Sequence, residues 1–415
     1  MIFFIVDWLK EIFGIKAPIA FEYYSTRMML AAITSVFISI FLGPWFIKKL
    51  YELKIGQTIR NEDCPLLGQL HEKKKDTPTM GGALILFSML ISMFLWMDLQ
   101  SVFTLTLFIT TVVFGLLGAR DDYLKLKYKN TKGISGKKKL FVQASLGAFL
   151  ALYLLCPPIT QSIHWGNWYQ PPIIKEQVRT KTNPVQIEIE GHSQQPSQAT
   201  ISLKDYASRL YIPFVKDPIL SFSGIFIVFA VFFIICVVAG SSNAVNLTDG
   251  LDGLAAGCLI LVASCLALFA FMSNNLDLAG YLNILYIEGS GEIAIYLSAF
   301  VGACIGFLWY NGYPAQVFMG DTGSLALGGV IGVSAVLLKR EFLLALIGGI
   351  FVAEALSVIL QVASYKLRNK KRVFLCAPLH HHFEYKGWPE TKVVIRFWIV
   401  GLLLAIIGLV SLKLQ

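Results

Sequence analysis

The chain has 415 residues, of which 56% are hydrophobic and 15% are charged, and its formal net charge is +9 at pH 7. Soluble domains carry about 25% charged residues, so a mean hydropathy of +0.65 excludes an ordinary soluble globular protein. Most of the chain is therefore expected to lie in lipid.

About ten apolar segments are long enough to cross a bilayer, which takes roughly 20 helical residues. We predict an all-α, polytopic membrane protein with a single integral membrane domain over residues 1–415. No internal repeat supports an inverted-repeat transporter. The expected spans cover approximately 25–47, 81–97, 102–118, 139–156, 219–239, 253–272, 293–309, 323–338, 341–364 and 392–412.

The basic residues indicate how the chain is oriented. They gather in three loops, 48–75, 120–139 and 366–392, which share one side when the number of spans is even. Lys and Arg favour the cytoplasmic side of a membrane, so both termini are expected to be periplasmic. The positive charge then indicates topology and contact with anionic membrane lipid, and no nucleic-acid partner is expected.

Residues 157–218 form the exception to the apolar pattern. They are rich in Pro, Gln and Ser, and the alternation at 185–190 predicts a short strand. We expect a periplasmic insertion within the membrane domain, with a small β-hairpin. None of the seven cysteines lies in it, so no disulfide framework is indicated.

Two adjacent carboxylates, Asp121 and Asp122, follow the third expected span. Neighbouring carboxylates at a membrane edge repel each other, which favours a bound cation or a raised pKa for one of them. Pairing with Arg120 and Lys125 at a solvated helix end explains the pair equally well. The residues alone leave both interpretations open.

The connection between the fifth and sixth spans contains more side chains that could bind a ligand. It contains Asn246, Asp249 and Asp252 with several glycines, and no basic residue lies within 243–253. Glycines allow close backbone approach, and the following helix offers N–H groups to an anion. An Asx turn that caps this helix would explain one Asp and one Gly, but not the whole set. We therefore expect a ligand-binding turn.

A similar pattern opens the eighth span. Asp321 lies between Gly320 and Gly323, and Phe318 precedes it. A metal ligand and an aromatic platform for a planar base are the functional interpretations. The alternatives are an N-cap for Asp321 and an interfacial aromatic for Phe318, and for Phe318 alone the latter is the better interpretation.

Three other segments contain polar or ionisable residues that could be functional. The consecutive histidines at 380–382 cannot all point one way on a helix, so a single zinc site is not expected, although they could bind phosphate or relay protons. Thr79 precedes Gly81-Gly82 at the start of the second span. Glu354 lies within the ninth span, where an ionisable side chain is functional or hydrogen-bonds inside the bundle.

Together these motifs resemble the phospho-N-acetylmuramoyl-pentapeptide transferases, a branch of the polyprenyl-phosphate N-acetylhexosamine-1-phosphate transferases. The resemblance covers nearly the whole chain, and the His-His-His-Phe-Glu motif favours the muramoyl branch. The insertion at 157–218 is where the chain departs from the family pattern. The matching motifs are Thr77-Pro78-Thr79-Met80-Gly81-Gly82, Asp121-Asp122-Tyr123-Leu124-Lys125, Asn246-Leu247-Thr248-Asp249-Gly250-Leu251-Asp252-Gly253, Phe318-Met319-Gly320-Asp321-Thr322-Gly323-Ser324 and Pro378-Leu379-His380-His381-His382-Phe383-Glu384.

The resemblance implies a reaction and its partners. Phospho-MurNAc-pentapeptide would pass from UDP-MurNAc-pentapeptide to undecaprenyl phosphate, giving lipid I and UMP, with Mg²⁺ as cofactor. A ten-helix fold in the bacterial inner membrane, a cytoplasmic active site and a homodimer would accompany it.

The resemblance also implies residue roles. Asp321 would be the metal ligand, Asp121 the base for the lipid phosphate with Asp122 assisting, and His380 would contact phosphate or support the metal. The substrate-binding residues would be Lys74, Thr79, Asn246, Asp249, Asp252, Phe318, His381 and His382. Direct attack and a covalent phospho-enzyme both remain open.

Two rival functions stay under consideration. A GlcNAc-1-phosphate transferase of the same superfamily would share every aspartate, so the accepted nucleotide sugar would separate the two. A cation-coupled transporter would need acids near the bilayer midplane, whereas these acids are predicted at the cytoplasmic ends of spans.

Overall fold

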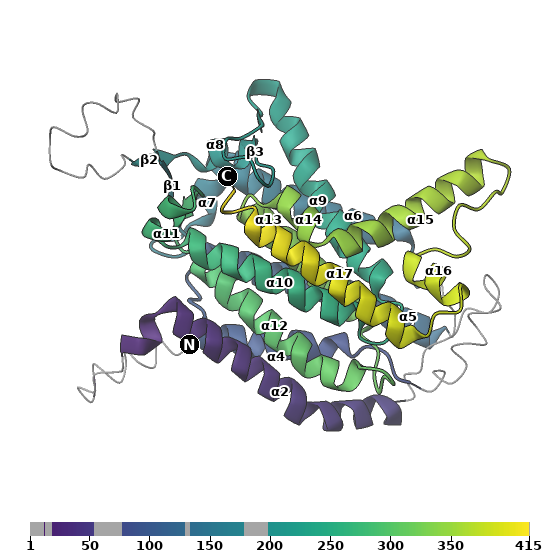
Figure 1. Ribbon diagram of the computed structural model, residues 1–415. Coiled ribbons are helices and arrows are strands. Elements are labelled where there is room, and N and C mark those ends of the chain that lie inside the picture. Colours follow the sequence, from purple (N-terminus) through teal and green to yellow (C-terminus); the bar gives the residue numbers. More distant parts are fainter. Residues whose placement is uncertain (1–11, 13–18, 54–76, 129–132, 178–197, 415) are drawn as a thin grey trace, which may run out of the picture.

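The computed structural model describes residue 12 and residues 19–53, 77–128, 133–177 and 198–414. The long helices cross the molecule side by side (Figure 1). They are α2 (Tyr24–Glu52), α4 (Gly82–Trp96), α5 (Val102–Lys127), α6 (Gly136–Leu155), α9 (Ile227–Thr248), α10 (Leu254–Ser273), α12 (Gly291–Asn311), α13 (Gly320–Leu337), α15 (Gly349–Leu367) and α17 (Glu390–Val410).

The prediction of an all-α polytopic membrane protein is confirmed. Within the described residues, nine helices are long and apolar enough to span a membrane, and α4 is a shorter apolar helix of 15 residues. Short helices connect them: η1 (Ile19–Glu22), α7 (Pro157–Ile163), α8 (Leu203–Ser208), η4 (Gly224–Phe226), α11 (Leu276–Tyr281), α14 (Glu341–Ile347) and α16 (Leu379–Tyr385).

Two expected spans have different limits in the structure. The span predicted at 219–239 is α9, which begins at Ile227 and continues to Thr248. Its polar C-terminal part stays helical because Ser242 and Asn243 are hydrogen-bonded inside the bundle. The span predicted at 341–364 is divided at Gly348 into α14 and α15, since adjacent glycines weaken a helix at that point.

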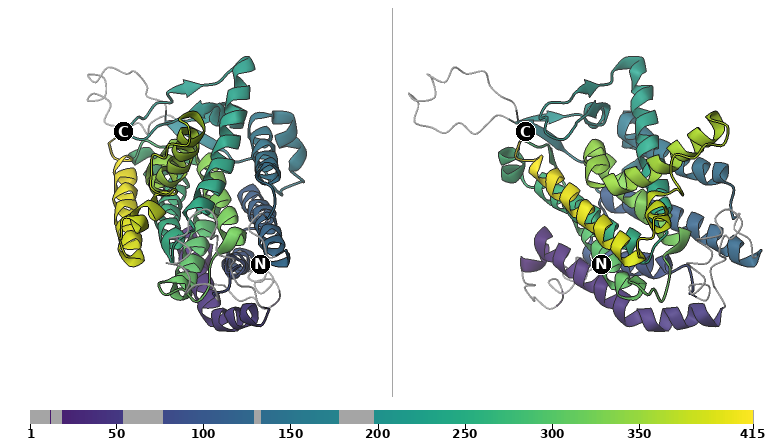
Figure 2. Two further views of the ribbon diagram at one scale, coloured as in Figure 1. Left: turned by 90° about the vertical axis from the view of Figure 1, so that its right-hand side faces the viewer. Right: turned by 45° about the vertical axis from the view of Figure 1, so that its right-hand side comes forward.

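Helix α13 is the centre of the bundle. It packs against α5 on one side and α9 on another, and 89% of its apolar window is buried. Small residues permit this packing: a Cβ placed on Gly329 would lie 2.1 Å from a ring carbon of Phe114 in α5. The outer helix α2 packs on α12, and α10 lies between α12 and α17, as the two views of Figure 2 show.

A small sheet lies at one end of the bundle, where α17 ends and α2 begins (Figure 1). β1 (Ile174–Gln177) pairs antiparallel with β2 (Gln198–Ile201) and with β5 (Tyr286–Ile287). β3 (Arg209–Leu210) and β4 (Leu220–Ser221) form a second pair. The β1–β2 pair agrees with a hairpin in the 157–218 segment, whereas the strand predicted at 185–190 lies outside the described residues.

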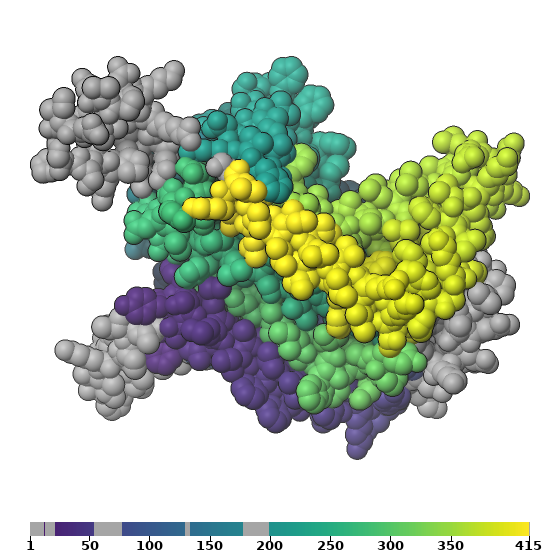
Figure 3. All heavy atoms as spheres, in the orientation of Figure 1, coloured from purple at the N-terminus to yellow at the C-terminus, as the bar shows by residue number. Residues whose placement is uncertain are grey.

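The space-filling view shows α17 lying across one face of the bundle and α15 projecting away from the bundle (Figure 3), and the chain then returns to α16 next to the start of α17 (Figure 1). Their outward residues are apolar, among them Leu356 and Ile359 of α15 and Ile399 and Leu403 of α17. Large exposed apolar faces are the surface that lipid covers in a membrane bundle.

Candidate active site

The carboxylates of Asp121, Asp122 and Asp321 meet where α5 passes the start of α13. Gly118 makes this approach possible, because a Cβ there would lie 2.1 Å from the carbonyl oxygen of Asp321. Residues three and four positions later on a helix occupy the same face, which aims both α5 aspartates at α13. One carboxylate oxygen from each of the three lies within 4.8 Å of the others.

Asp122 is bound to the first turn of α13. Its Oδ2 accepts hydrogen bonds from the Thr322 amide at 2.9 Å and the Thr322 hydroxyl at 2.7 Å, while Oδ1 accepts from the Asp321 amide at 3.2 Å. Free N–H groups at a helix N-terminus favour an anion. The carboxylate therefore satisfies donors that α13 would otherwise leave unpaired.

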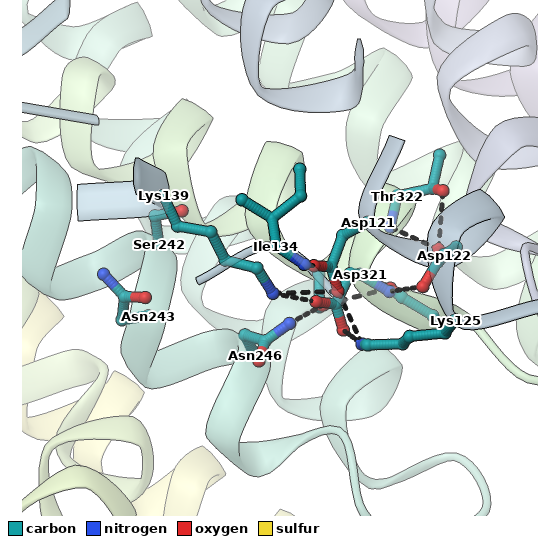
Figure 4. A network of polar contacts seen from close by, with 12 residues as sticks. Asp121, Asp122, Lys125, Ile134, Lys139, Ser242, Asn243, Asn246, Asp321 and Thr322 are labelled. Atoms are coloured by element: carbon teal, nitrogen blue, oxygen red, sulfur yellow. Dashed lines mark hydrogen bonds and ion pairs between the residues drawn. The ribbon is translucent and has the colours of Figure 1, made fainter. Parts of the chain in front are cut away.

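Two lysines approach Asp121 and Asp321 from opposite sides, and each contacts both carboxylates (Figure 4). Lys125 Nζ is 2.7 Å from Asp121 and 3.1 Å from Asp321, and Lys139 Nζ from α6 is 2.9 Å and 2.5 Å from the same carboxylates. Asp121 is fully buried and also accepts a hydrogen bond from the Ile134 amide at 2.6 Å. The acidic cluster thus binds cationic groups from two sides.

The end of α9 approaches the cluster from a third direction. Asn246 donates to the Ser324 hydroxyl at 2.9 Å. One turn earlier, Asn243 donates to Gln143 at 2.8 Å, and Gln143 donates to Ser242 at 3.0 Å. Buried amides and hydroxyls that hydrogen-bond to one another favour a single arrangement of the helices. These hydrogen bonds therefore fix α6, α9 and α13 beside the acids.

Asp249 follows α9 and lies next to the cluster. It accepts a hydrogen bond from the Gly320 backbone, and burial together with the charges of Asp321 and Asp122 raises the pKa of Asp249 to about 7. A carboxyl group with such a pKa exchanges its proton near neutrality, which is a property of functional sites.

Asp252 has a different environment. Its Oδ2 accepts from the Ala315 amide at 2.9 Å, and its own amide donates to Glu390 at 2.8 Å. The next residue, Gly253, donates to Asn311 at 3.0 Å. Asp252 therefore joins the turn to the segment that leads to Phe318, and it is not one of the three clustered carboxylates.

The segment before α4 runs alongside the segment before α13. The Phe318 amide donates to the Pro78 carbonyl at 2.8 Å, and the Gly81 amide donates to the Phe318 carbonyl at 2.8 Å. This pairing brings Thr79 beside Gly320, where an added Cβ would lie 2.8 Å from the Thr79 hydroxyl. Thr79 and the half-buried Phe318 thus border the acids. Lys74 lies outside the described residues.

His380 packs against the turn that follows α9. It is 1% exposed, and its Nδ1 is 3.2 Å from Oε2 of Glu354 in α15. The backbone amide of His380 donates to the other oxygen of Glu354 at 3.1 Å. On its opposite edge the ring touches Gly250, where an added Cβ would lie 2.3 Å from Nε2.

The other two histidines point elsewhere, as the sequence predicted for consecutive helical positions. His381 Nδ1 pairs with Glu384 at 2.8 Å. His382 Nδ1 accepts from the Leu375 amide at 3.1 Å, and burial followed by the charge of Lys386 lowers the pKa of His382. His382 therefore supports the loop before α16 in its neutral form.

Comparison with known proteins places this geometry in a family. Residues 197–339 match Glycosyl transferase family 4, and residues 74–86 match Phospho-N-acetylmuramoyl-pentapeptide-transferase signature 1. The phospho-N-acetylmuramoyl-pentapeptide-transferase of Protochlamydia amoebophila is 68% identical over 100% of both chains. Proteins of the same name from Desulfotalea psychrophila and Thermodesulfovibrio yellowstonii are 42% and 44% identical over 95% of both chains.

This chain belongs to the phospho-N-acetylmuramoyl-pentapeptide-transferase family.

In this family member, the three-carboxylate cluster has the donor set of a divalent-cation site. Hard cations prefer carboxylate oxygens together with phosphate oxygens. The two lysine ammonium groups against Asp121 and Asp321 show that the cluster attracts positive charge. Asp321 has the most accessible carboxylate of the three, with a side chain 15% exposed.

The sequence did not single out several residues that surround the acidic cluster in the structure. Lys139 stands at the start of a span, where a lysine is ordinarily a topology signal, so nothing local marks it as a partner of Asp321. Lys125 was considered only as a surface charge partner. Thr322, Ser324 and Gln143 are ordinary polar residues whose contacts depend on which helices meet.

Proposed function

We propose that this chain transfers phospho-MurNAc-pentapeptide from UDP to undecaprenyl phosphate, forming lipid I and UMP. The observation that carries the proposal is the cluster of Asp121, Asp122 and Asp321, flanked by two lysines at one end of a membrane bundle. Phosphoryl transfer needs positioning and charge neutralisation more than covalent assistance. Family membership supplies the two substrates.

In the proposed reaction, an oxygen of the lipid phosphate attacks the sugar-bound phosphorus of the nucleotide. The bond to the uridine-bearing phosphate breaks, and UMP leaves. Asp121 accepts the remaining proton of the lipid phosphate. Asp122 keeps α5 and the start of α13 at a fixed distance, since both of its oxygens are bound to that helix.

Asp321 is proposed to hold Mg²⁺, with Asp121 and Asp122 near enough to share it. When bound, Mg²⁺ supplies charge neutralisation on the transferring phosphate oxygens. Lys125 and Lys139 would then be free to turn from the carboxylates toward substrate phosphates, because an ammonium group on a four-carbon stem is mobile.

The nucleotide side of the site is proposed to lie along the turn after α9. Asn246 and Asp249 stand beside the acids, and Asp252 supports the segment that carries Phe318. Phe318 is proposed to stack on the uracil ring. Lys74 and the histidines at 380–382 are also proposed to contact the substrate, with His380 next to Gly250 of this turn, and Thr79 is proposed to contact it from beside Gly320.

We further propose that the acidic end faces the cytoplasm of a bacterial inner membrane and that both termini are periplasmic. The basic residues of the connections at this end support the orientation. Residues 157–218 would form the periplasmic insertion of a single membrane domain, and family membership suggests a homodimer.

The deciding experiment uses purified full-length protein, undecaprenyl phosphate and Mg²⁺, with either UDP-MurNAc-pentapeptide or UDP-GlcNAc. We expect lipid I and UMP from the first nucleotide sugar and no lipid product from the second. Transfer from UDP-GlcNAc would instead identify an N-acetylglucosamine-1-phosphate transferase. The transporter alternative has less support, because the clustered acids lie at helix ends.

A further inference from the structure

Glu354 is a carboxylate deep in the bundle that the proposed reaction does not use. It lies in α15 and is 0% exposed. An ionisable side chain at such a position is costly unless it has partners. Both of its oxygens face one residue, His380: Oε1 accepts from the backbone amide at 3.1 Å, and Oε2 lies 3.2 Å from Nδ1.

The other ring nitrogen of His380 has a contrasting environment. Both ring nitrogens are buried and neither makes a hydrogen bond among the described residues, but Nδ1 has the Glu354 carboxylate at 3.2 Å, whereas Nε2 has no ion-pair partner among them either. It lies against Gly250, an exposed residue with no side chain that could cover the ring. Gly250 directly follows Asp249, which is hydrogen-bonded to the backbone of Gly320 beside Asp321. Nε2 therefore faces the turn next to the acidic cluster.

A carboxylate beside one imidazole nitrogen holds the proton on that nitrogen and fixes the ring, leaving the other nitrogen for a ligand. The remaining polar neighbours do not compete for this role. The His381 ring centroid is 4.2 Å from that of His380, but His381 is paired with Glu384. The Cys258 thiol of α10 lies near Glu354 and carries no charge in its thiol form.

We propose that Glu354 is a positioning residue for His380. Its carboxylate holds the ring and the Nδ1 proton, so that Nε2 is the nitrogen available to a phosphate oxygen of the nucleotide sugar bound at the Asp249–Gly253 turn. This inference rests on the proposed transferase function, and it assigns to Glu354 a role that acts only through His380.

The test is a double-mutant cycle on the full-length enzyme with Glu354→Gln and His380→Asn. Removal of a carboxylate that orients a histidine typically lowers activity by about 10–100-fold, and we expect that loss in kcat for Glu354→Gln. The KM for UDP-MurNAc-pentapeptide should change by less than about twofold, because loss of an interaction that acts mainly in the transition state lowers kcat with little effect on KM. The double variant should be no slower than His380→Asn alone.

Glu341→Gln is the matched control. Glu341 is also a buried carboxylate, 3% exposed and paired with Lys339 at 2.7 Å, but it lies beyond the end of α13 that is remote from Asp321. It should lower the melting temperature and leave kcat unchanged. A kcat loss equal to that of Glu354→Gln would show a general effect of removing buried charge and overturn the proposal.

Multiplicative losses in the double variant would also overturn it, because Glu354 would then act independently of His380. If Glu354→Gln does not fold, Gly250→Ala carries the same test, since its Cβ would meet Nε2 from the opposite side. A kcat loss that vanishes in the His380→Asn background supports the inference, and one that persists refutes it. If wild-type protein makes no lipid I, the proposed function itself fails.

Discussion

At Gly118, beside the acids, α5 lies close against the backbone of α13, and Gly118→Ala tests whether this close approach sets the geometry of the site. The added Cβ would lie 2.1 Å from the carbonyl oxygen of Asp321, whereas ordinary contact begins at 3.4 Å. Backbone cannot rotate away as a side chain can. The helices must therefore separate by about 1.3 Å, the difference between these distances.

That separation acts directly on Asp121 and Asp122, which lie one turn after Gly118. A misplacement of about 1 Å can cost 10²-fold in rate, and overpacking typically costs about 1–3 kcal/mol of stability. We expect the initial rate of lipid I formation to fall about 100-fold at saturating substrates. The melting temperature of the purified protein should fall as well, although the protein should still fold.

Gly115→Ala is the control on the same helix, one turn earlier. Its Cβ would meet only the Cδ1 atom at the end of the Leu86 side chain, at 2.7 Å, and that atom can move by rotation. This variant should keep a rate close to that of the wild type. A Gly118→Ala enzyme within twofold of the wild-type rate, or a Gly115→Ala enzyme equally impaired, would refute the argument that close helix approach positions the carboxylates.

Three other predictions follow from the site. Asp121→Asn should be slowest below about pH 6 and recover partly as the pH rises past the second phosphate pKa of the lipid, about 6, whereas Asp321→Asn should not recover; no recovery of Asp121→Asn at any pH would favour a covalent role. Lys139→Gln should lower the rate about 10–100-fold, the effect of losing a charged hydrogen bond, and a Mg²⁺ titration should restore part of it. With the seven native cysteines replaced, an impermeant thiol reagent should label Ser162→Cys in intact cells and Glu52→Cys only after permeabilisation; the reverse pattern would contradict the proposed orientation.

The sequence was sufficient to predict where the functional groups lie along the helices. Apolar runs of span length locate the ends of the helices. Because successive spans cross the membrane in opposite directions, the helix ends that carry the motifs can be assigned to one side of the membrane. Asp121 and Asp321 could therefore be assigned to the same end of the bundle, although they are far apart in the chain. Their direct proximity depends on Gly118, whose importance appears only when α13 lies against it.

Pairings between distant helices could not be obtained in the same way. Lys139 and Asp321 are 182 positions apart. A lysine before a span has the same local sequence whether it orients the helix in the membrane or belongs to a functional site. The division of the ninth span at Gly348 was missed because both halves are apolar. Glu354 was ambiguous for a related reason, since its partner His380 belongs to a segment that folds back onto α15.

The atoms of the acidic cluster also fasten helices to one another. Asp122 ties α5 to α13, and Lys139 ties α6 to both of them. An inhibitor that binds these carboxylates and ammonium groups would leave few routes to resistance. Each substitution that removes a contact with the drug would also loosen the helix bundle in which the site is built.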